Sequence, residues 1–362
     1  MKNIKFEKIE NFRDLGGYEC RYGETSFGVI YRSATLAYAS NNDIKKIENL
    51  GIKTVIDLRE EITKKNLPNP FKNHAKVGYI PLNVNGNGRI PKDYNDGIDS
   101  YFEMLEDPYT VRKILKSIIF SPKPLVIHCN AGKDRTGVFA FLILLMNGVD
   151  FYDLNADYML SFPYLFNMTI DTMKNHPEVT SHVLTPNIFY MKDFYDQFLE
   201  RYGSGENYCE SIGLNDEEIN ALANILGKRD QSFGAIVINQ QNKILIEHMK
   251  EGHFALPKGH KENVDSHINE TIMREVLEET GIRINVLEGY EGITFYSPKD
   301  GMLKEVVYKL ARTYDSEIKI QKEEVDNAYF LNIDDAIRVL TYQSDKDILI
   351  EGIKKYIEIF GD

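Results

Sequence analysis

A short apolar run, a loop containing a glycine and a long apolar run follow one another between Leu125 and Val149. The first run, LVIH, is short and rich in β-branched residues, which predicts a buried strand. The second, GVFAFLILLMNGV, is apolar on every face, which predicts a helix buried by other parts of the chain. Its 13 residues are too few for a membrane span, which needs roughly 20. This order of strand, loop and buried helix indicates a layered fold.

Further strand-like runs, Lys53–Leu58 and Val77–Leu82, precede it and alternate with longer runs of helical period. Such alternation predicts an α/β fold with a central, mainly parallel sheet flanked by helices. Residues 151–200, dense in Tyr and Phe, are expected to form further helices. Leu214–Leu226 has the pattern of a capped amphipathic helix that closes this domain.

A polar stretch without periodicity, GKRDQSFG at 227–234, is the best candidate for a linker. A length of 362 residues favours about two domains, so we expect one at 1–230 and another at 231–362. The second has a different, α+β order of elements. We expect two paired strands at Ala235–Asn239 and Lys243–Glu247, followed by a helix at Asn269–Thr280. A further strand is expected at Glu305–Arg312 and a last helix at 346–359.

Charge and cysteine content narrow the classes of function. The net charge is −12, with −4 in residues 1–230 and −8 in 231–362, so a nucleic-acid coat is not expected and DNA is not an expected partner. The acidic second half has carboxylates available for a divalent cation. Three cysteines, Cys20, Cys129 and Cys209, cannot form a disulfide framework, and no signal-peptide core is present at the N-terminus. A cytoplasmic protein without a membrane span is therefore expected.

The loop of the first domain reads HCNAGKDRTG and places Cys129 six positions before Arg135. Backbone N–H groups of such a loop can form a nest for a tetrahedral anion, and the N-terminus of the following helix adds positive potential. That potential favours the thiolate, which is the nucleophilic form of cysteine. Arg135 can bind two phosphoryl oxygens, and Thr136 can donate a hydrogen bond to the departing thiolate. The predicted phosphate-binding residues are Asn130, Ala131, Gly132, Lys133, Arg135 and Thr136.

Two steps follow from these residues: Cys129 attacks phosphorus, and water hydrolyses the phosphocysteine. A carboxylic acid must protonate the leaving alcohol. Asp134 is the first candidate and Asp57 the second, while the polar region 83–99 offers Asp93 or Asp96 on a flap. His128 and the arginines Arg13, Arg32 and Arg59 are interpreted as structural.

HCNAGKDRTG resembles the signature loop of the protein tyrosine phosphatase superfamily. With NFRDLGGY (11–18), YRSA (31–34) and VIDLR (55–59) upstream, the chain is similar to the bacterial branch that acts on phosphotyrosine, phosphoserine/threonine and phosphoinositides. The resemblance spans most of residues 1–226 and implies Cys129 as nucleophile, Arg135 as phosphate binder, and Lys133 with Asp134 as the pair that widens substrate choice. It implies no cofactor in this domain. The chain has no Trp, so no Trp-Pro-Asp flap is present.

A second candidate site lies in residues 255–282, which read ALPKGHKENVDSHINETIMREVLEETGI. On a helix, Glu275, Glu278 and Glu279 share one face, and Arg274 stands four residues before Glu278. Converging carboxylates are hard oxygen ligands that favour Mg²⁺ or Mn²⁺. Gly259 lets the preceding loop approach closely, with its carbonyl as a further ligand, and Gly281 is expected to end the helix.

This segment resembles the Nudix box of hydrolases that cleave organic diphosphates, whose fold is a mixed sheet between helices. Gly259, Arg274, Gly281 and the three glutamates fall on its positions, whereas Asp265 replaces the usual first Glu and one extra residue lies between Gly259 and Arg274. The flanking sequences resemble the subgroup that hydrolyses diadenosine and diphosphoinositol polyphosphates.

Together these features predict a bifunctional hydrolase. The first domain would act on phosphomonoesters of a protein or small molecule, and the second would be a Mg²⁺-dependent diphosphatase, with Glu278 catalytic, acting on nucleotide or inositol diphosphates. Two alternatives stay open: a phosphatase regulated by a non-catalytic, nucleotide-binding Nudix module, and a phosphopeptide-binding scaffold with neither centre active.

Overall fold

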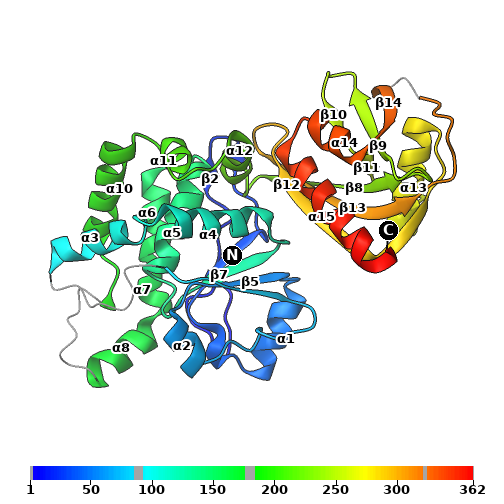
Figure 1. Cartoon of the computed structure of the whole chain (residues 1–362). Coiled ribbons are helices and arrows are strands. Elements are labelled where there is room, and N and C mark those ends of the chain that lie inside the picture. The colour runs from blue at the N-terminus through cyan, green and yellow to red at the C-terminus, as the bar shows by residue number, and fades with distance from the viewer. Residues whose placement is uncertain (1–2, 85–92, 176–183, 321–323, 362) are drawn as a thin grey trace. The chain divides into compact units, whose positions relative to one another are not determined.

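The computed structural model describes residues 3–84, 93–175, 184–320 and 324–361 (Figure 1). It divides into two compact units, one of Met1–Lys228 with Lys299–Gly301 and the other of Arg229–Pro298 with Met302–Asp362. Among the described residues, no helix is both long and apolar enough to cross a membrane. The two-domain organisation predicted from the sequence is confirmed.

The first unit is built on a five-stranded sheet in the order β1-β4-β7-β5-β6. Four strands run parallel, and only β1 at the edge is antiparallel to its neighbour. The predicted parallel sheet is confirmed. The strands, with a separate small hairpin of β2 and β3, are β1 Arg13–Asp14, β2 Glu19–Cys20, β3 Gly23–Glu24, β4 Ile30–Ser33, β5 Thr54–Asp57, β6 Gly78–Pro81 and β7 Leu125–His128.

The register brings the carboxyl ends of three neighbouring strands together, since Ser33 of β4, His128 of β7 and Asp57 of β5 are in line. Ligands of open parallel sheets bind beyond these ends. The helices are α1 Asn41–Asn49, α2 Glu61–Asn66, α3 Tyr94–Glu103, α4 Pro108–Phe120, α5 Arg135–Met146, α6 Phe151–Met159, α7 Ser161–Tyr164, α8 Phe166–Asn175, α10 Ile188–Tyr202, α11 Gly205–Ser211 and α12 Asp216–Ala223, with a 3₁₀ turn at Leu36–Tyr38.

Helices cover both faces of this sheet (Figure 1). On the face of α1, Ile47 packs with the strand residues Tyr31, Val55 and Val126. The apolar helix α5 lies on the other side, and all of its residues except Leu145 are buried. The helix predicted to be buried on every side is therefore confirmed, and its N-terminus follows directly from the loop after β7.

The second unit holds a seven-stranded sheet in which β10-β9-β8-β13-β12 form the main path, β11 pairs with β8, and β14 pairs with β9. Most pairs are antiparallel. Lys228 N donates to Gly301 O and Thr313 N donates to Ile238 O, so β8 and β13 run in the same direction and the sheet is mixed, as predicted. The elements are β8 Lys228–Ile238, β9 Ile244–Met249, β10 Phe254–Ala255, β11 Lys258–His260, α13 Ile268–Thr280, β12 Asn285–Tyr296, β13 Met302–Arg312, β14 Val325–Leu331, α14 Ile333–Val339 and α15 Gln343–Phe360.

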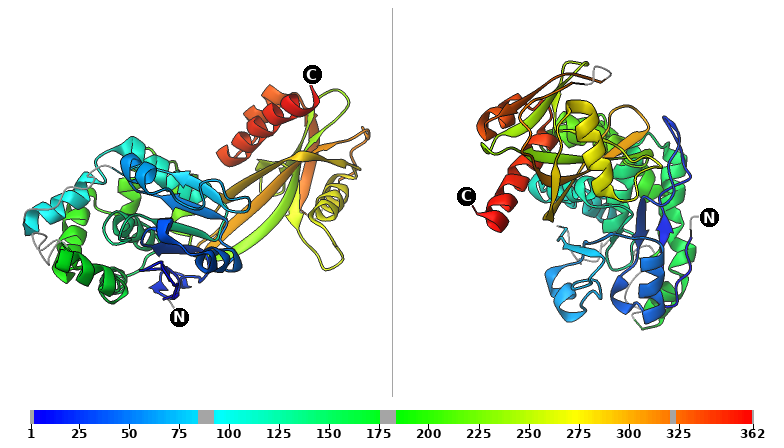
Figure 2. Two further views of the ribbon diagram at one scale, coloured as in Figure 1. Left: turned by 90° about the horizontal axis from the view of Figure 1, so that it is seen from below. Right: turned by 90° about the vertical axis from the view of Figure 1, so that its right-hand side faces the viewer.

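The sheet of the second unit lies between α13 and α15 (Figure 2). Because side chains of a strand alternate between faces, Ile236 and Ile238 pack toward α15, whereas Ala235 and Val237 pack toward α13. The predicted α+β class is confirmed.

The segment 227–234, predicted to be a linker, contains the boundary between the two units but is not a loop. Most of it belongs to β8, and its polar side chains are bound from other strands of the sheet. Arg229 and Gln231 both donate to Glu305, while Asp230 contacts His260 at 2.9 Å and Lys304 at 3.3 Å. A strand whose polar groups are paired across the sheet lacks the alternation by which strands are recognised.

Candidate active sites

The thiol of Cys129 lies at the carboxyl end of β7, and the residue is 3% exposed. The backbone N–H of Gly132 donates to its Sγ at 3.2 Å. Gly132 has a φ of +68°, and a Cβ at this position would lie 2.2 Å from Ser33 O. Only glycine fits there, because the loop turns back sharply against β4.

The carbonyl oxygens of the loop all receive a hydrogen bond from the surrounding protein. Leu58 N donates to the carbonyl of residue 128 at 2.8 Å, His128 Nδ1 to that of 129 at 3.1 Å, and Thr35 N to that of 130 at 2.8 Å. Asn11 Nδ2 donates to the carbonyls of 131 and 132 at 2.9 and 3.2 Å. Arg32 Nη2 donates to the carbonyls of 132 and 133 at 2.8 and 3.2 Å. By contrast, the described chain supplies no acceptor for the backbone N–H groups of Asn130, Ala131, Asp134 and Arg135. A loop with bound carbonyls and unbound N–H groups is a nest for an anion.

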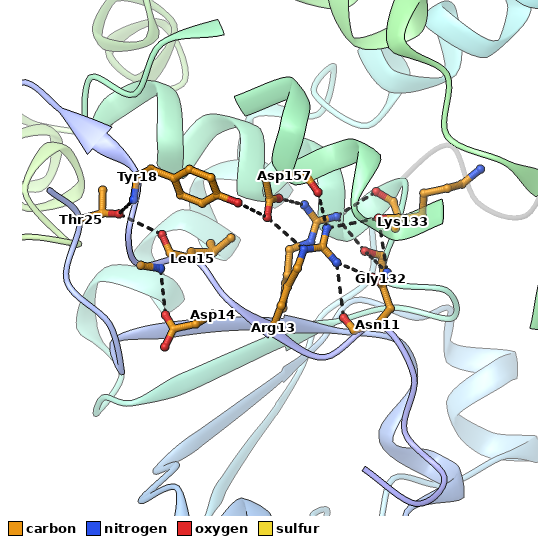
Figure 3. Close-up of polar contacts among 12 residues, drawn as sticks. Asn11, Arg13, Asp14, Leu15, Tyr18, Thr25, Gly132, Lys133 and Asp157 are labelled. Carbon is orange, nitrogen blue, oxygen red and sulfur yellow. Dashed lines mark hydrogen bonds and ion pairs between the residues drawn. The ribbon is translucent and has the colours of Figure 1, made fainter. Parts of the chain in front are cut away.

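Two buried arginines and one buried carboxylate hold this loop from behind (Figure 3). Arg13 Nε lies 3.0 Å from Asp157 Oδ1, and Arg32 Nη1 lies 2.5 Å from Asp157 Oδ2. Tyr18 donates its hydroxyl to Asp157 at 2.9 Å. Burial works to raise the pKa of Asp157, but both arginines outweigh it and lower that pKa to about 2. The interpretation of Arg13 and Arg32 as structural agrees with these contacts.

Arg135 is 9% exposed at the first turn of α5. Its Nη1 is buried and has no hydrogen-bond partner in the described chain, since Glu60 Oε1 is 3.8 Å away. The Oγ1 of Thr136 is also buried and unpartnered within the described ranges. Lys133 is 4% exposed, with its Nζ 3.5 Å from Asp134 Oδ1. An unused guanidinium N–H at the mouth of the nest is available to a bound anion.

Asp134 is the candidate acid with the best placement. Its carboxylate is 39% exposed and accepts a 2.7 Å hydrogen bond from Tyr101, which also contacts the Tyr158 hydroxyl at 2.9 Å. Asp93 is the N-cap of α3, where its side chain accepts a hydrogen bond from Asp96 N, and Asp96 lies in the first turn. Part of the region 83–99, residues 85–92, falls outside the described residues.

Asp57 is unsuited to the role of acid. It is fully buried and accepts from Arg59 at 2.7 to 3.1 Å and from Tyr79 at 3.0 Å. Burial works to raise its pKa, but the neighbouring His128 and the ion pair with Arg59 outweigh burial and hold that pKa well below the usual range. Burial lowers the pKa of His128, whose Nε2 contacts Asn69 at 2.8 Å. Both side chains therefore fix the loop in place.

Four residues at this site carry no role in the sequence interpretation: Asn11, Glu60, Tyr101 and Asp157. Asn11 belongs to the segment NFRDLGGY, and membership of that segment was the one feature of the sequence that could have assigned it to this site. Tyr101 and Glu60 lie 33 and 75 residues before their loop partners Asp134 and Arg135, and Asp157 lies 125 residues after Arg32.

In the second unit, α13 presents its glutamates to the loop before it. The Glu275 carboxylate lies against Gly259, where a Cβ would come within 1.9 Å of the carboxyl carbon. Arg274 binds Asp265 Oδ2 at 2.9 Å, Glu275 Oε1 at 3.0 Å and Glu278 Oε2 at 3.0 Å. Hydrogen bonds from Arg274 hold the pKa of Asp265 below its usual range. Gly281 ends the helix in the left-handed conformation, with its N–H donating to Leu277 O.

Glu279 on α13, which the sequence predicts as a metal ligand, forms a buried pair with Glu247 on β9, which sequence reasoning missed. Glu247 is 1% exposed and Glu279 is 8% exposed. Burial raises the pKa of both carboxyls. One oxygen of each, Glu247 Oε1 and Glu279 Oε2, is buried without a hydrogen-bond partner in the described chain.

These glutamates line a cavity of about 700 Å³. Its described lining carries seven glutamates, Glu247, Glu251, Glu262, Glu275, Glu278, Glu279 and Glu324, against four lysine or arginine side chains, Lys250, Lys258, Arg274 and Lys304. Tyr296 adds an aromatic ring, which stacks at 11° on Tyr342 with 6.3 Å between the ring centres.

The residues fit a divalent cation in chemistry, because unpartnered buried carboxylate oxygens and a glycine cradle are what such an ion requires. They do not converge into a finished site: no three ligating side chains of the described residues stand close enough to hold a metal. Arg274 instead forms ion pairs with both Glu275 and Glu278, each at 3.0 Å.

Comparison with known proteins identifies a family for each of the two units. Residues 4–228 match the family model described as the tyrosine phosphatase family, and residues 228–351 match the NUDIX domain. A protein of Cupriavidus necator, provisionally named a tyrosine-protein phosphatase, is 28% identical over 57% of this chain and 82% of its own length. A tyrosine-protein phosphatase of Nostoc commune is 24% identical over 58% of this chain and 78% of its own length.

Among solved structures, an Ap4A hydrolase of C. elegans is 22% identical and covers 36% of this chain and 98% of its own, with a TM-score of 0.33. The NUDIX domain of a Shewanella oneidensis protein is 18% identical and covers 36% of this chain and 89% of its own, with a TM-score of 0.30.

Proposed function

The chain belongs to the tyrosine phosphatase family and carries a NUDIX domain, and from this premise we propose that it is a bifunctional hydrolase. The first unit would hydrolyse phosphomonoesters through a phosphocysteine, and the second would cleave diphosphates. The proposed phosphatase activity rests on the geometry of one loop. Its carbonyls 128–133 accept hydrogen bonds from the protein, while neighbouring N–H groups have no acceptor in the described chain.

In the first site, Cys129 would attack phosphorus while the loop N–H groups and Arg135 bind the phosphoryl oxygens. These donors are fixed before substrate arrives, so they would stabilise transition-state charge without reorganising. Asp134 would protonate the leaving oxygen, and Thr136 would donate to the thiolate when water releases phosphate. No cofactor is needed for these steps, which use only groups of the first unit.

In the second site, Glu275, Glu278, Glu279 and the Gly259 carbonyl would hold Mg²⁺ or Mn²⁺. The ion would supply charge compensation for the diphosphate. The substrate we favour is a nucleoside or dinucleoside polyphosphate, because the Tyr296 ring offers a face to a base. An inositol pyrophosphate carries more negative charge than such a nucleotide, so the seven glutamates would repel it more strongly. It also has no aromatic group to contact Tyr296.

One observation favours a second candidate, a phosphatase whose Nudix module binds a nucleotide without cleaving it. Arg274 holds both Glu275 and Glu278, which weakens their ability to converge on a cation. Calorimetry with nucleotide and Mg²⁺ would then give a binding signal, while phosphate analysis would detect no product.

The main test uses Cys129→Ser and Glu278→Gln separately in the full chain, with p-nitrophenyl phosphate and diadenosine tetraphosphate as substrates. We expect Cys129→Ser to abolish monoester turnover only, and Glu278→Gln and EDTA to abolish diphosphate turnover only. Cys209→Ser, a buried thiol of the same unit, and Glu291→Gln, an exposed glutamate of the second, are the matched controls. Monoester turnover that survives in Cys129→Ser would refute the first assignment.

The acid can be identified by the leaving group. Asp134→Asn should slow phenyl phosphate, whose alcohol needs a proton, far more than p-nitrophenyl phosphate. If Asp93→Asn shows that selective loss instead, the acid comes from α3.

A further inference from the structure

A carboxylate occupies a core position of β9 in the second unit. Leu245 and Glu247 lie two residues apart on one strand, so their side chains point to the same face of the sheet. Leu245 packs with Ile272 and Val276 of α13. Glu247 is the next inward residue and is equally buried, at 1% exposure. An apolar side chain would continue the core there at no electrostatic cost, so the acidic one calls for an explanation.

The facing position on α13 is acidic as well. Ile272, Val276 and Glu279 follow at helical spacing along the inward stripe of that helix, and Glu279 is 8% exposed. Its carboxylate lines the same cavity as that of Glu247, and the two negative charges repel each other. Glu247 Oε1 and Glu279 Oε2 have no partner in the described chain. Buried polar atoms without partners are rare in proteins and point to a missing ligand.

The protein itself supplies little positive charge at this point. Lys258 of β11 lines the same cavity and attracts both carboxylates, but it forms no ion pair or hydrogen bond with either among the described residues. Arg274, on the same helix, is bound to other carboxylates. Both glutamates line the cavity that also receives Glu275 and Gly259.

We infer that Glu247 is a ligand of the divalent cation of this cavity, paired with Glu279 and supplied by a strand outside the glutamate-rich helix. This inference rests on the diphosphatase function proposed above. Mg²⁺ binds through carboxylates and retains several waters, so Glu247 can join the ligands proposed above while part of the coordination sphere stays hydrated.

The test is a Mn²⁺ titration of the full chain followed by electron paramagnetic resonance, which reports bound ion without any substrate. Glu247→Gln keeps the shape of the side chain and can still hydrogen-bond Glu279, but it removes the charged ligand. We expect both Glu247→Gln and Glu279→Gln to weaken Mn²⁺ binding at least tenfold, and Glu247→Asp to recover part of the loss. Glu291→Gln, an exposed site on β12, should bind within twofold of the unchanged protein.

A second readout is the rise in melting temperature that Mn²⁺ causes in the second unit, which should shrink in Glu247→Gln in parallel with binding. Unchanged Mn²⁺ binding by Glu247→Gln, together with loss in Glu279→Gln, would overturn this inference and leave the diphosphatase proposal standing. If the unchanged protein binds no Mn²⁺, both fail.

Discussion

Asp157→Asn is the substitution that most directly tests how the phosphate-binding loop is held. Asp157 is 1% exposed and neutralises two guanidiniums that are themselves buried, Arg13 and Arg32. Removing one partner of a buried ion pair leaves uncompensated charge and costs roughly 3 to 5 kcal/mol. The shift of the Asp157 pKa from 3.8 to about 2 corresponds to roughly 2.5 kcal/mol from the charge alone. The substitution also replaces an acceptor oxygen by an amide, so its cost exceeds that value.

The assay is calorimetric melting of the full chain, with the transition of the first unit identified by loss of phosphatase activity on heating. For a unit of this size, about 1 kcal/mol lowers the melting temperature by roughly 2 to 4 °C, so we expect a fall of about 10 °C at pH 7. Phosphatase kcat should fall at least tenfold, because Arg32 would no longer fix two loop carbonyls. Asp153→Asn, on the same helix, removes a carboxylate of the first turn and should cost under about 1 kcal/mol.

The pH dependence has a definite sign. A carboxyl whose pKa is lowered on folding contributes stability above its unfolded pKa and loses it as pH falls toward the folded value. The difference between Asp157→Asn and the unchanged protein should therefore be full above about pH 4 and shrink between pH 4 and 2. A melting temperature within 2 °C of the unchanged protein at pH 7, with full activity, would refute this account of the loop.

Three further substitutions follow from the same contacts. Gly132→Ala places a Cβ 2.2 Å from the β4 backbone at a positive φ, and should abolish monoester turnover while diphosphate turnover is unaffected. Gly259→Ala displaces the Glu275 carboxylate, and should weaken Mn²⁺ binding at least tenfold in an electron paramagnetic resonance titration. Tyr18→Phe removes one donor to Asp157, and should lower the melting temperature of the first unit by about 2 to 4 °C, well short of the Asp157→Asn effect.

The parts of the fold that the sequence predicts well are those whose signal is local. Leu125–His128 is a strand as predicted, and the apolar run after it forms α5 within two residues of the expected start. Two further elements were also predicted from neighbouring residues alone. They are the strand pair around the turn near Asn239 and the helix that ends at Gly281. In each case burial, period and turn residues agree within a window of about fifteen positions.

The parts that sequence reasoning missed depend on partners far along the chain. The start of β8 looks like a linker because Arg229 meets Glu305 only in the folded sheet, 76 residues later. Asp157 is one of several acidic residues on a helix until folding places it between Arg13 and Arg32, 144 and 125 positions away. Glu247 resembles an ordinary exposed strand end, and only the fold brings it against Glu279. Long-range pairing of charges has no local sequence signature.

The two sites treat the phosphoryl group in opposite electrostatic ways. At the first, positive potential is built into the protein by loop N–H groups, a helix N-terminus and Arg135, so an anion can bind directly. At the second, seven glutamates among the described lining residues outnumber the four lysine and arginine side chains, so a diphosphate is repelled until a cation enters. The first site therefore depends on the buried network that orients its backbone, and the second depends on an ion that its carboxylates attract. Substitutions of Asp157 and of Glu247 act on these two different supports, which is why each should disable one activity and leave the other intact.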